Sequence, residues 1–86
     1  MTVYVDAARN PYGRMIMCHM LADNIDELHA MADRIGVSRK WFQKNNVPHY
    51  DICMSKRKLA VKYGAIDIEK GKVLELVRKY RAEAQP

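Results

Sequence analysis

The stretch MIMCHMLADNIDELHAMADRIG, residues 15–36, carries the clearest structural signals in the chain. Its first seven residues are apolar apart from His19, a composition typical of a strand. Asn24, followed three residues later by Glu27, matches the capping pattern that begins a helix, and Gly36 is a typical helix end. The stretch therefore predicts a strand followed by a helix over residues 24–35. One face of that helix carries an apolar stripe, formed by Ile25, Leu28, Ala32 and Ile35.

Strand and helix signals alternate on both sides of this stretch. Residues 2–6 (TVYVD) predict a first strand, and residues 7–14 predict a loop because they contain Asn10-Pro11 and Gly13. The rest of the chain predicts a strand or turn at 40–43, a loop at 44–48, a strand at 49–54, a helix at 55–63 capped by Ser55, a short strand at 65–68, a helix at 70–82 and a frayed tail at 83–86.

This alternation favours one small α/β domain over residues 1–86, a sandwich in which about three helices pack against a three- or four-stranded sheet. A chain of 86 residues is too short for a large catalytic cavity or for a separate dinucleotide-binding subdomain. We therefore expect any site to be a surface cleft, which a second copy of the chain could complete as a homodimer.

The charge of the chain is unevenly distributed. The net charge is +5; residues 1–43 carry five positive and five negative side chains, and residues 44–86 carry ten and five. A basic half favours an anionic partner such as nucleic acid, a nucleotide or an acidic protein; the alternative is a solvated helix surface. The opening residues lack the pattern of a secretory leader and no apolar run reaches membrane-spanning length, so we expect a cytoplasmic protein with reduced thiols.

Several short motifs occur together in this chain: CHMLAD (18–23), ELHAMADRIG (27–36), WFQ (41–43), PHYD (48–51) and SKRKLAVKYGA (55–65). With this combination the chain resembles a family of small bacterial and phage proteins, the domain of unknown function DUF4031. The resemblance extends from the first predicted strand to Ile68. It implies that the motifs belong together, and it implies no particular activity.

Six residues could ligate a metal, but their spacing differs from that of structural zinc sites. In strands, Cys18 and His19 would point to opposite faces, whereas His49 and Asp51 would share one. A catalytic or divalent-metal site could combine His49 and Asp51 with His19 or His29, although structural histidines are the alternative. We expect no resident cofactor and leave a divalent metal possible. The six residues are Cys18, His19, His29, His49, Asp51 and Cys53.

Two of these residues also have simpler interpretations. His29 lies at the edge of the apolar stripe of the first helix, where a pairing with Asp33 one turn later is expected. Cys18 could act as a nucleophile if a base such as His49 approached it, but the default interpretation is a small buried thiol.

The predicted start of the helix at Ser55 suggests an anion site. Unpaired N–H groups and the helix dipole attract anions there. Lys56 and Arg57 lie in the same turn, where cations oppose the dipole, so a bound phosphate would relieve that conflict. The alternative is an exposed basic turn without a ligand. Under the anion-site hypothesis, removal of Arg57 should weaken phosphate binding but cost the unliganded protein little stability, because an exposed charge contributes little on its own.

The sequence thus favours a domain that binds a phosphate-bearing ligand, a nucleotide or nucleic acid. Trp41 could stack on a base beside Arg39 and Lys40; the alternative is that at least one ring of Trp41 and Phe42 belongs to the core. Asp6, at the end of the first strand, could lie at a ligand-binding sheet edge that Arg14 also reaches; alternatively, Asp6 caps its turn or pairs with an arginine. The alternatives are a phosphoester or nucleotide hydrolase and a protein-binding module, such as a phage protein that captures a host factor. Candidate catalytic residues are His19, His49 and Asp51; candidate ligand-binding residues are Asp6, Arg14, Trp41, Tyr50, Lys56 and Arg57.

Overall fold

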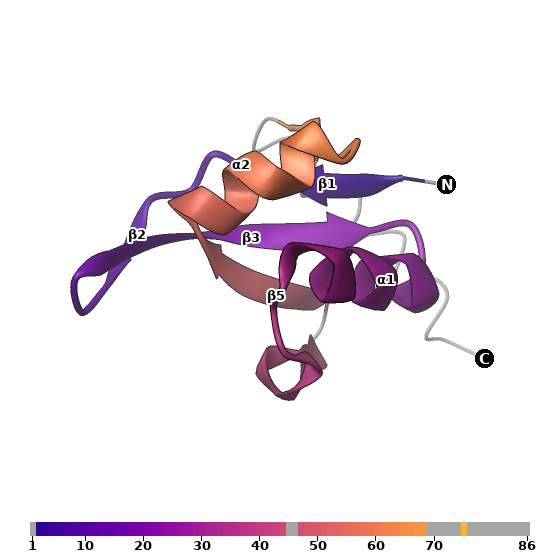
Figure 1. Ribbon diagram of the computed structural model, residues 1–86, viewed down its shortest axis with the longest axis horizontal. Coiled ribbons are helices and arrows are strands. Elements are labelled where there is room, and N and C mark those ends of the chain that lie inside the picture. Colours follow the sequence, from indigo (N-terminus) through magenta and orange to yellow (C-terminus); the bar gives the residue numbers. More distant parts are fainter. Residues whose placement is uncertain (1, 45–46, 69–74, 76–86) are drawn as a thin grey trace.

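The computed structural model describes residues 2–44, 47–68 and 75, and this part of the chain forms a small α/β domain built on a mixed sheet (Figure 1). The strand order is β4-β5-β3-β1-β6, with β2 paired to the outer part of β3. Among the strands of the described residues, β1 and β6 are the one parallel pair. The strands are β1 (Val3–Val5), β2 (Asn10–Tyr12), β3 (Met15–Ala22), β4 (Gln43–Lys44), β5 (Pro48–Cys53) and β6 (Ile66–Asp67).

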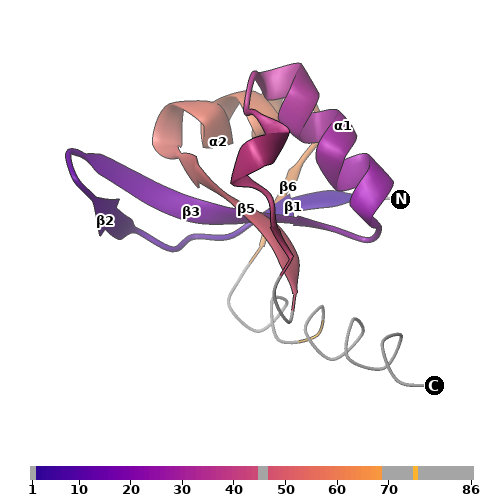
Figure 2. The same cartoon turned by 90° about the horizontal axis from the view of Figure 1, so that it is seen from below.

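Two α-helices, α1 (Ile25–Ile35) and α2 (Met54–Lys62), cover the same face of the sheet (Figures 1 and 2). A short 3₁₀ helix, η1 (Arg39–Trp41), leads from α1 into β4. The predicted α/β class is confirmed, but the sheet has six strands where three or four were expected. Apart from Glu75, which is helical, the expected helix over 70–82 lies outside the described residues, as does the expected frayed tail over 83–86. No helix within those residues has the length and apolar character needed to cross a membrane.

The central strands β3 and β5 alternate between two environments. Cys18 and Met20 of β3, with Tyr50 and Ile52 of β5, are at most 1% exposed and pack under the helices. Successive residues of a strand point to opposite faces. The half-buried residues between them therefore lie on the face away from α1 and α2.

The first helix has the bounds that its capping signals predicted. The Asn24 side chain accepts a hydrogen bond from the Glu27 backbone N–H at 2.9 Å, and Gly36 ends the helix with φ of 80°. The second helix begins differently: Cys53 occupies the position before it, and Ser55 lies inside its first turn. The prediction that Ser55 caps this helix is therefore wrong.

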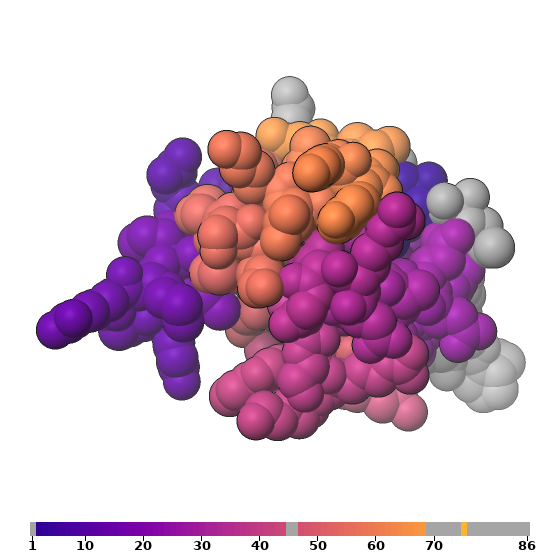
Figure 3. All heavy atoms as spheres, in the orientation of Figure 1, coloured from indigo at the N-terminus to yellow at the C-terminus, as the bar shows by residue number. Residues whose placement is uncertain are grey.

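Residues 7–14, predicted to be a loop, contain strand β2. It pairs with the beginning of β3 around Gly13, whose φ of 60° suits a tight turn. Pro11 is tolerated because β2 is an exposed edge strand. The space-filling view shows this hairpin projecting from one end of the molecule, while the atoms of α1 and α2 lie against each other (Figure 3).

The alternation along β5 predicts opposite sensitivities for adjacent residues. Ile52→Ala removes a buried side chain and should lower the free energy of unfolding by about 2–5 kcal/mol. Asp51→Asn alters a half-exposed side chain on the other face and should change it by less than about 1 kcal/mol. Urea unfolding monitored by circular dichroism measures both; equal losses would contradict the assignment of the two faces.

Candidate functional site

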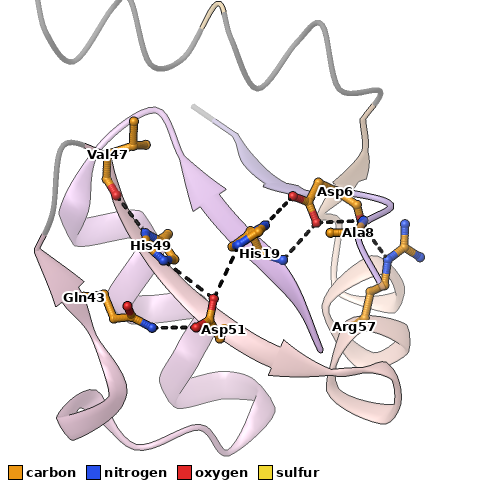
Figure 4. A network of polar contacts seen from close by, with 8 residues as sticks. All are labelled: Asp6, Ala8, His19, Gln43, Val47, His49, Asp51 and Arg57. Carbon is orange, nitrogen blue, oxygen red and sulfur yellow. Dashed lines mark hydrogen bonds and ion pairs between the residues drawn. The ribbon is translucent and has the colours of Figure 1, made fainter. Parts of the chain in front are cut away.

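His19, His49 and Asp51 meet on the sheet face opposite the two helices (Figure 4). The pairing of β3 with β5 sets His19 directly across from Asp51, and His49 shares the face of Asp51 because it lies two residues earlier. Asp51 Oδ1 lies 3.7 Å from His19 Nε2 and 3.6 Å from His49 Nε2. The structure thus brings together the three candidate catalytic residues.

Each of these side chains is held by a hydrogen bond on its far side. His19 Nδ1 lies 2.6 Å from Asp6 Oδ2, and His49 Nδ1 donates to the carbonyl of Val47 at 2.8 Å. The Gln43 side-chain amide donates to Asp51 Oδ2 at 2.6 Å. These contacts direct His19 Nε2, His49 Nε2 and Asp51 Oδ1 toward one another. One atom from each residue could therefore serve as a metal ligand.

Asp6 fixes the position of His19 through hydrogen bonds to its backbone and its ring. It is 7% exposed, and its Oδ1 accepts hydrogen bonds from the backbone N–H groups of His19 at 2.9 Å and Ala8 at 3.2 Å. The hydrogen bond from Ala8 gives Asp6 the turn-capping role that was one of the alternatives from the sequence. The other alternative was an ion pair between the Asp6 carboxylate and an arginine, and its partner is instead His19. Arg14 lies exposed at the turn between β2 and β3.

The basic start of α2 differs from the exposed turn that was expected. The Arg57 side chain is only 21% exposed; its Nε donates to the Asp6 carbonyl at 3.0 Å, and its Nη2 lies 2.7 Å from Asp67 Oδ1. Lys56 is half-buried, with its ammonium group near Gly36. Arg57 is therefore a structural link between α2, β6 and the residue that supports His19.

Tyr50, expected on the binding surface, is 0% exposed and belongs to the core. Its hydroxyl hydrogen-bonds His29 Nδ1 at 2.7 Å, and Phe42 packs against the His29 ring at a centroid distance of 4.6 Å. Burial raises the pKa of Tyr50 above its usual value. The expected pairing of His29 with Asp33 is replaced by this contact, because Asp33 binds Arg39 at 2.8 Å.

The aromatic pair of the WFQ motif divides between surface and core. Phe42 packs inward, whereas Trp41 is 58% exposed with Lys40 Nζ 5.2 Å from its ring centroid. Trp41 is two residues before Gln43, which holds Asp51. Gln43 and Val47 were not predicted as site residues; only the inclusion of Gln43 in the motif pointed to it.

Neither cysteine belongs to the group of donor atoms that His19, His49 and Asp51 form. Cys18 is 0% exposed and faces the helices; burial, reinforced by the Asp6 carboxylate, raises its pKa to about 11. The Cys53 thiol contacts Ser55 Oγ at 3.2 Å, and this hydrogen bond lowers its pKa. Cys18 is therefore the buried thiol that the sequence favoured and is unsuited to nucleophilic attack.

The contacts of Arg57 predict a stability effect. Arg57→Ala should lower the free energy of unfolding by about 1–3 kcal/mol, because it removes a charged hydrogen bond to a buried backbone carbonyl. The exposed Lys58, on the same turn, is the matched control, and Lys58→Ala should change it by less than about 0.5 kcal/mol. Chemical unfolding of both variants tests this prediction. Equal stabilities would show that the contacts of Arg57 with Asp6 and Asp67 do not stabilise the fold.

The comparisons with known proteins identify a family and nothing more specific. No curated protein and no solved structure matches the chain. A family model described as "Protein of unknown function (DUF4031)" matches residues 3–80. That match includes β1 and runs through every residue of the site, from Asp6 to Asp67. Because it also covers most of the 86 residues, the chain belongs to the DUF4031 family.

Proposed function

We propose that the protein is a hydrolase of phosphoester bonds in nucleotides or nucleic acids, with its catalytic centre at His19, His49 and Asp51. The observation that carries the proposal is the convergence of two imidazole Nε2 atoms on one carboxylate oxygen, within 3.7 Å. All three side chains are partly exposed, so a substrate can reach them. Active centres join residues from distant parts of a chain in this way.

The centre is suited to activating water. The bonds that occupy Nδ1 of each imidazole leave the lone pairs of His19 Nε2 and His49 Nε2 available beside Asp51 Oδ1, where they can either accept the proton of a water or hold a metal ion that activates it. In the proposed reaction, the water oxygen forms a new bond to phosphorus and the ester P–O bond breaks. The leaving oxygen gains one proton, which balances the proton that the water loses.

Charge and one exposed ring support the choice of substrate. The chain carries a net charge of +5, which favours anionic ligands. Trp41 offers an exposed aromatic face beside Lys40, an arrangement that suits base stacking next to a phosphate contact. Gln43, two residues further along, contacts the catalytic centre. Trp41 is therefore only two residues along the chain from a side chain that contacts the proposed catalytic centre.

Hydrolysis of bis(4-nitrophenyl) phosphate and of short single-stranded oligonucleotides tests the proposal. Asp51→Asn and His49→Gln should each lower kcat/KM by roughly 10²–10⁴-fold, the usual contribution of such groups. His29→Gln is the control, because that imidazole contacts Tyr50 on the helix side of the sheet. Absence of hydrolysis by the wild-type protein, or equal rates in all three variants, would refute the proposal.

The substrate class has a separate measurement. Trp41 is the only tryptophan, so its fluorescence reports base stacking directly. Trp41→Phe should retain part of the oligonucleotide affinity, and Trp41→Ala should weaken it by about 5–150-fold. Tyr12→Ala, at another exposed ring on the hairpin, should leave affinity unchanged. Oligonucleotides that neither quench Trp41 nor discriminate between the variants would exclude stacking at this site.

A further inference from the structure

We propose that His19, His49 and Asp51 bind one divalent transition-metal ion, of the Zn²⁺, Mn²⁺ or Fe²⁺ class, and leave its remaining positions open to water and substrate. The inference deepens the proposed function and rests on the same centre, because it names the ion that would activate the water. Two imidazole nitrogens and one carboxylate oxygen are a common protein ligand set for catalytic metals with open positions.

The distances between the three donor atoms suit a metal better than they suit hydrogen bonds. At 3.6 and 3.7 Å, Asp51 Oδ1 is too far from His49 Nε2 and His19 Nε2 for a hydrogen bond. Ligand atoms of a tetrahedral zinc site, with bonds of about 2.1 Å, lie about 3.4 Å apart. All three atoms lie within 4.8 Å of one another. The two distances from Asp51 Oδ1 are therefore within a few tenths of an ångström of the separation that a tetrahedral site requires.

The hydrogen bonds at Nδ1 of the two histidines determine that the free lone pair of each ring is on Nε2. A backbone carbonyl only accepts, so His49 Nδ1 carries a hydrogen toward Val47, and the neutral ring then has its lone pair on Nε2. The Asp6 carboxylate has the same effect on His19. Three lone-pair donors that face one another repel, and a cation between them would remove that repulsion. Histidines that ligate metals usually donate their other N–H to a carboxylate or a carbonyl, as both do here.

The fold holds this arrangement with little freedom. His19 and Asp51 are register partners on adjacent central strands, and His49 lies on the same strand as Asp51. Gln43 of β4, the register partner of His49, holds the second oxygen of Asp51. Sites built on strands keep their geometry better than sites built on loops. Imidazole ligands also favour transition metals over Mg²⁺ and Ca²⁺, which prefer oxygen.

Titration of the untagged, chelator-treated full chain with Co²⁺ and Zn²⁺ tests the inference. We expect one equivalent to bind, with visible Co²⁺ absorption that Zn²⁺ abolishes and a large excess of Mg²⁺ does not. Asp51→Asn and His49→Gln should weaken binding at least 100-fold, and Asp6→Asn about 10–100-fold through loss of the support behind His19. His29→Gln, which alters the remaining histidine of the chain, should bind as the wild type does.

A measurement on the wild-type chain avoids dependence on variant folding. In the Co²⁺-loaded protein, paramagnetically shifted imidazole N–H resonances should arise from two histidines, because both ligands keep a hydrogen on Nδ1. Absence of saturable Co²⁺ and Zn²⁺ binding, or shifted resonances from His29, would overturn the inference. Metal binding without phosphoester hydrolysis would refute only the proposed function. Hydrolysis that persists in excess chelator would refute only the metal centre.

Discussion

The hydrogen bonding between Asp6 and His19 is the constraint on which the site depends. The Asp6 backbone N–H donates to the His19 carbonyl at 3.0 Å, Oδ1 accepts from the His19 N–H, and Oδ2 pairs with Nδ1 of the ring. A buried carboxylate is costly unless such partners satisfy it. The end of β1 is thereby joined to the middle of β3, and Arg57 extends the link to α2 through the Asp6 carbonyl. The ring of His19 has one orientation because these groups must be satisfied together.

The sheet separates two kinds of histidine chemistry. On the helix side, His29 hydrogen-bonds Tyr50, and both are enclosed by the aromatic packing of Phe42. On the other side, His19 and His49 each hydrogen-bond through Nδ1 alone within the described part of the chain, and their Nε2 atoms face Asp51. In the first arrangement, the polar groups of His29 and Tyr50 satisfy each other and stabilise the fold. The second leaves lone pairs directed at a shared point, which is the property that binding and catalysis require.

Local periodicity explains what could be predicted from the sequence. His49 and Asp51 were expected on one face because two residues separate them on a strand, and the same period places Tyr50, which was assigned to the binding surface, on the opposite face. The choice of His19 over His29 depended on the register between β3 and β5, which no local signal contains. Arg57 was wrongly predicted to be exposed. Its partner Asp67 is placed beside it by the parallel pairing of β6 with β1, which no local signal contains either.

The central claim is that both site histidines present Nε2 lone pairs to Asp51. Long-range ¹H–¹⁵N correlation NMR of the histidine rings, on chelator-treated protein at pH 8, reports the tautomer of each ring directly. The account predicts that His19 and His49 carry their hydrogen on Nδ1, held by Asp6 and Val47. A hydrogen on Nε2 of either ring would contradict it, because that nitrogen could then neither accept a proton from water nor ligate a metal.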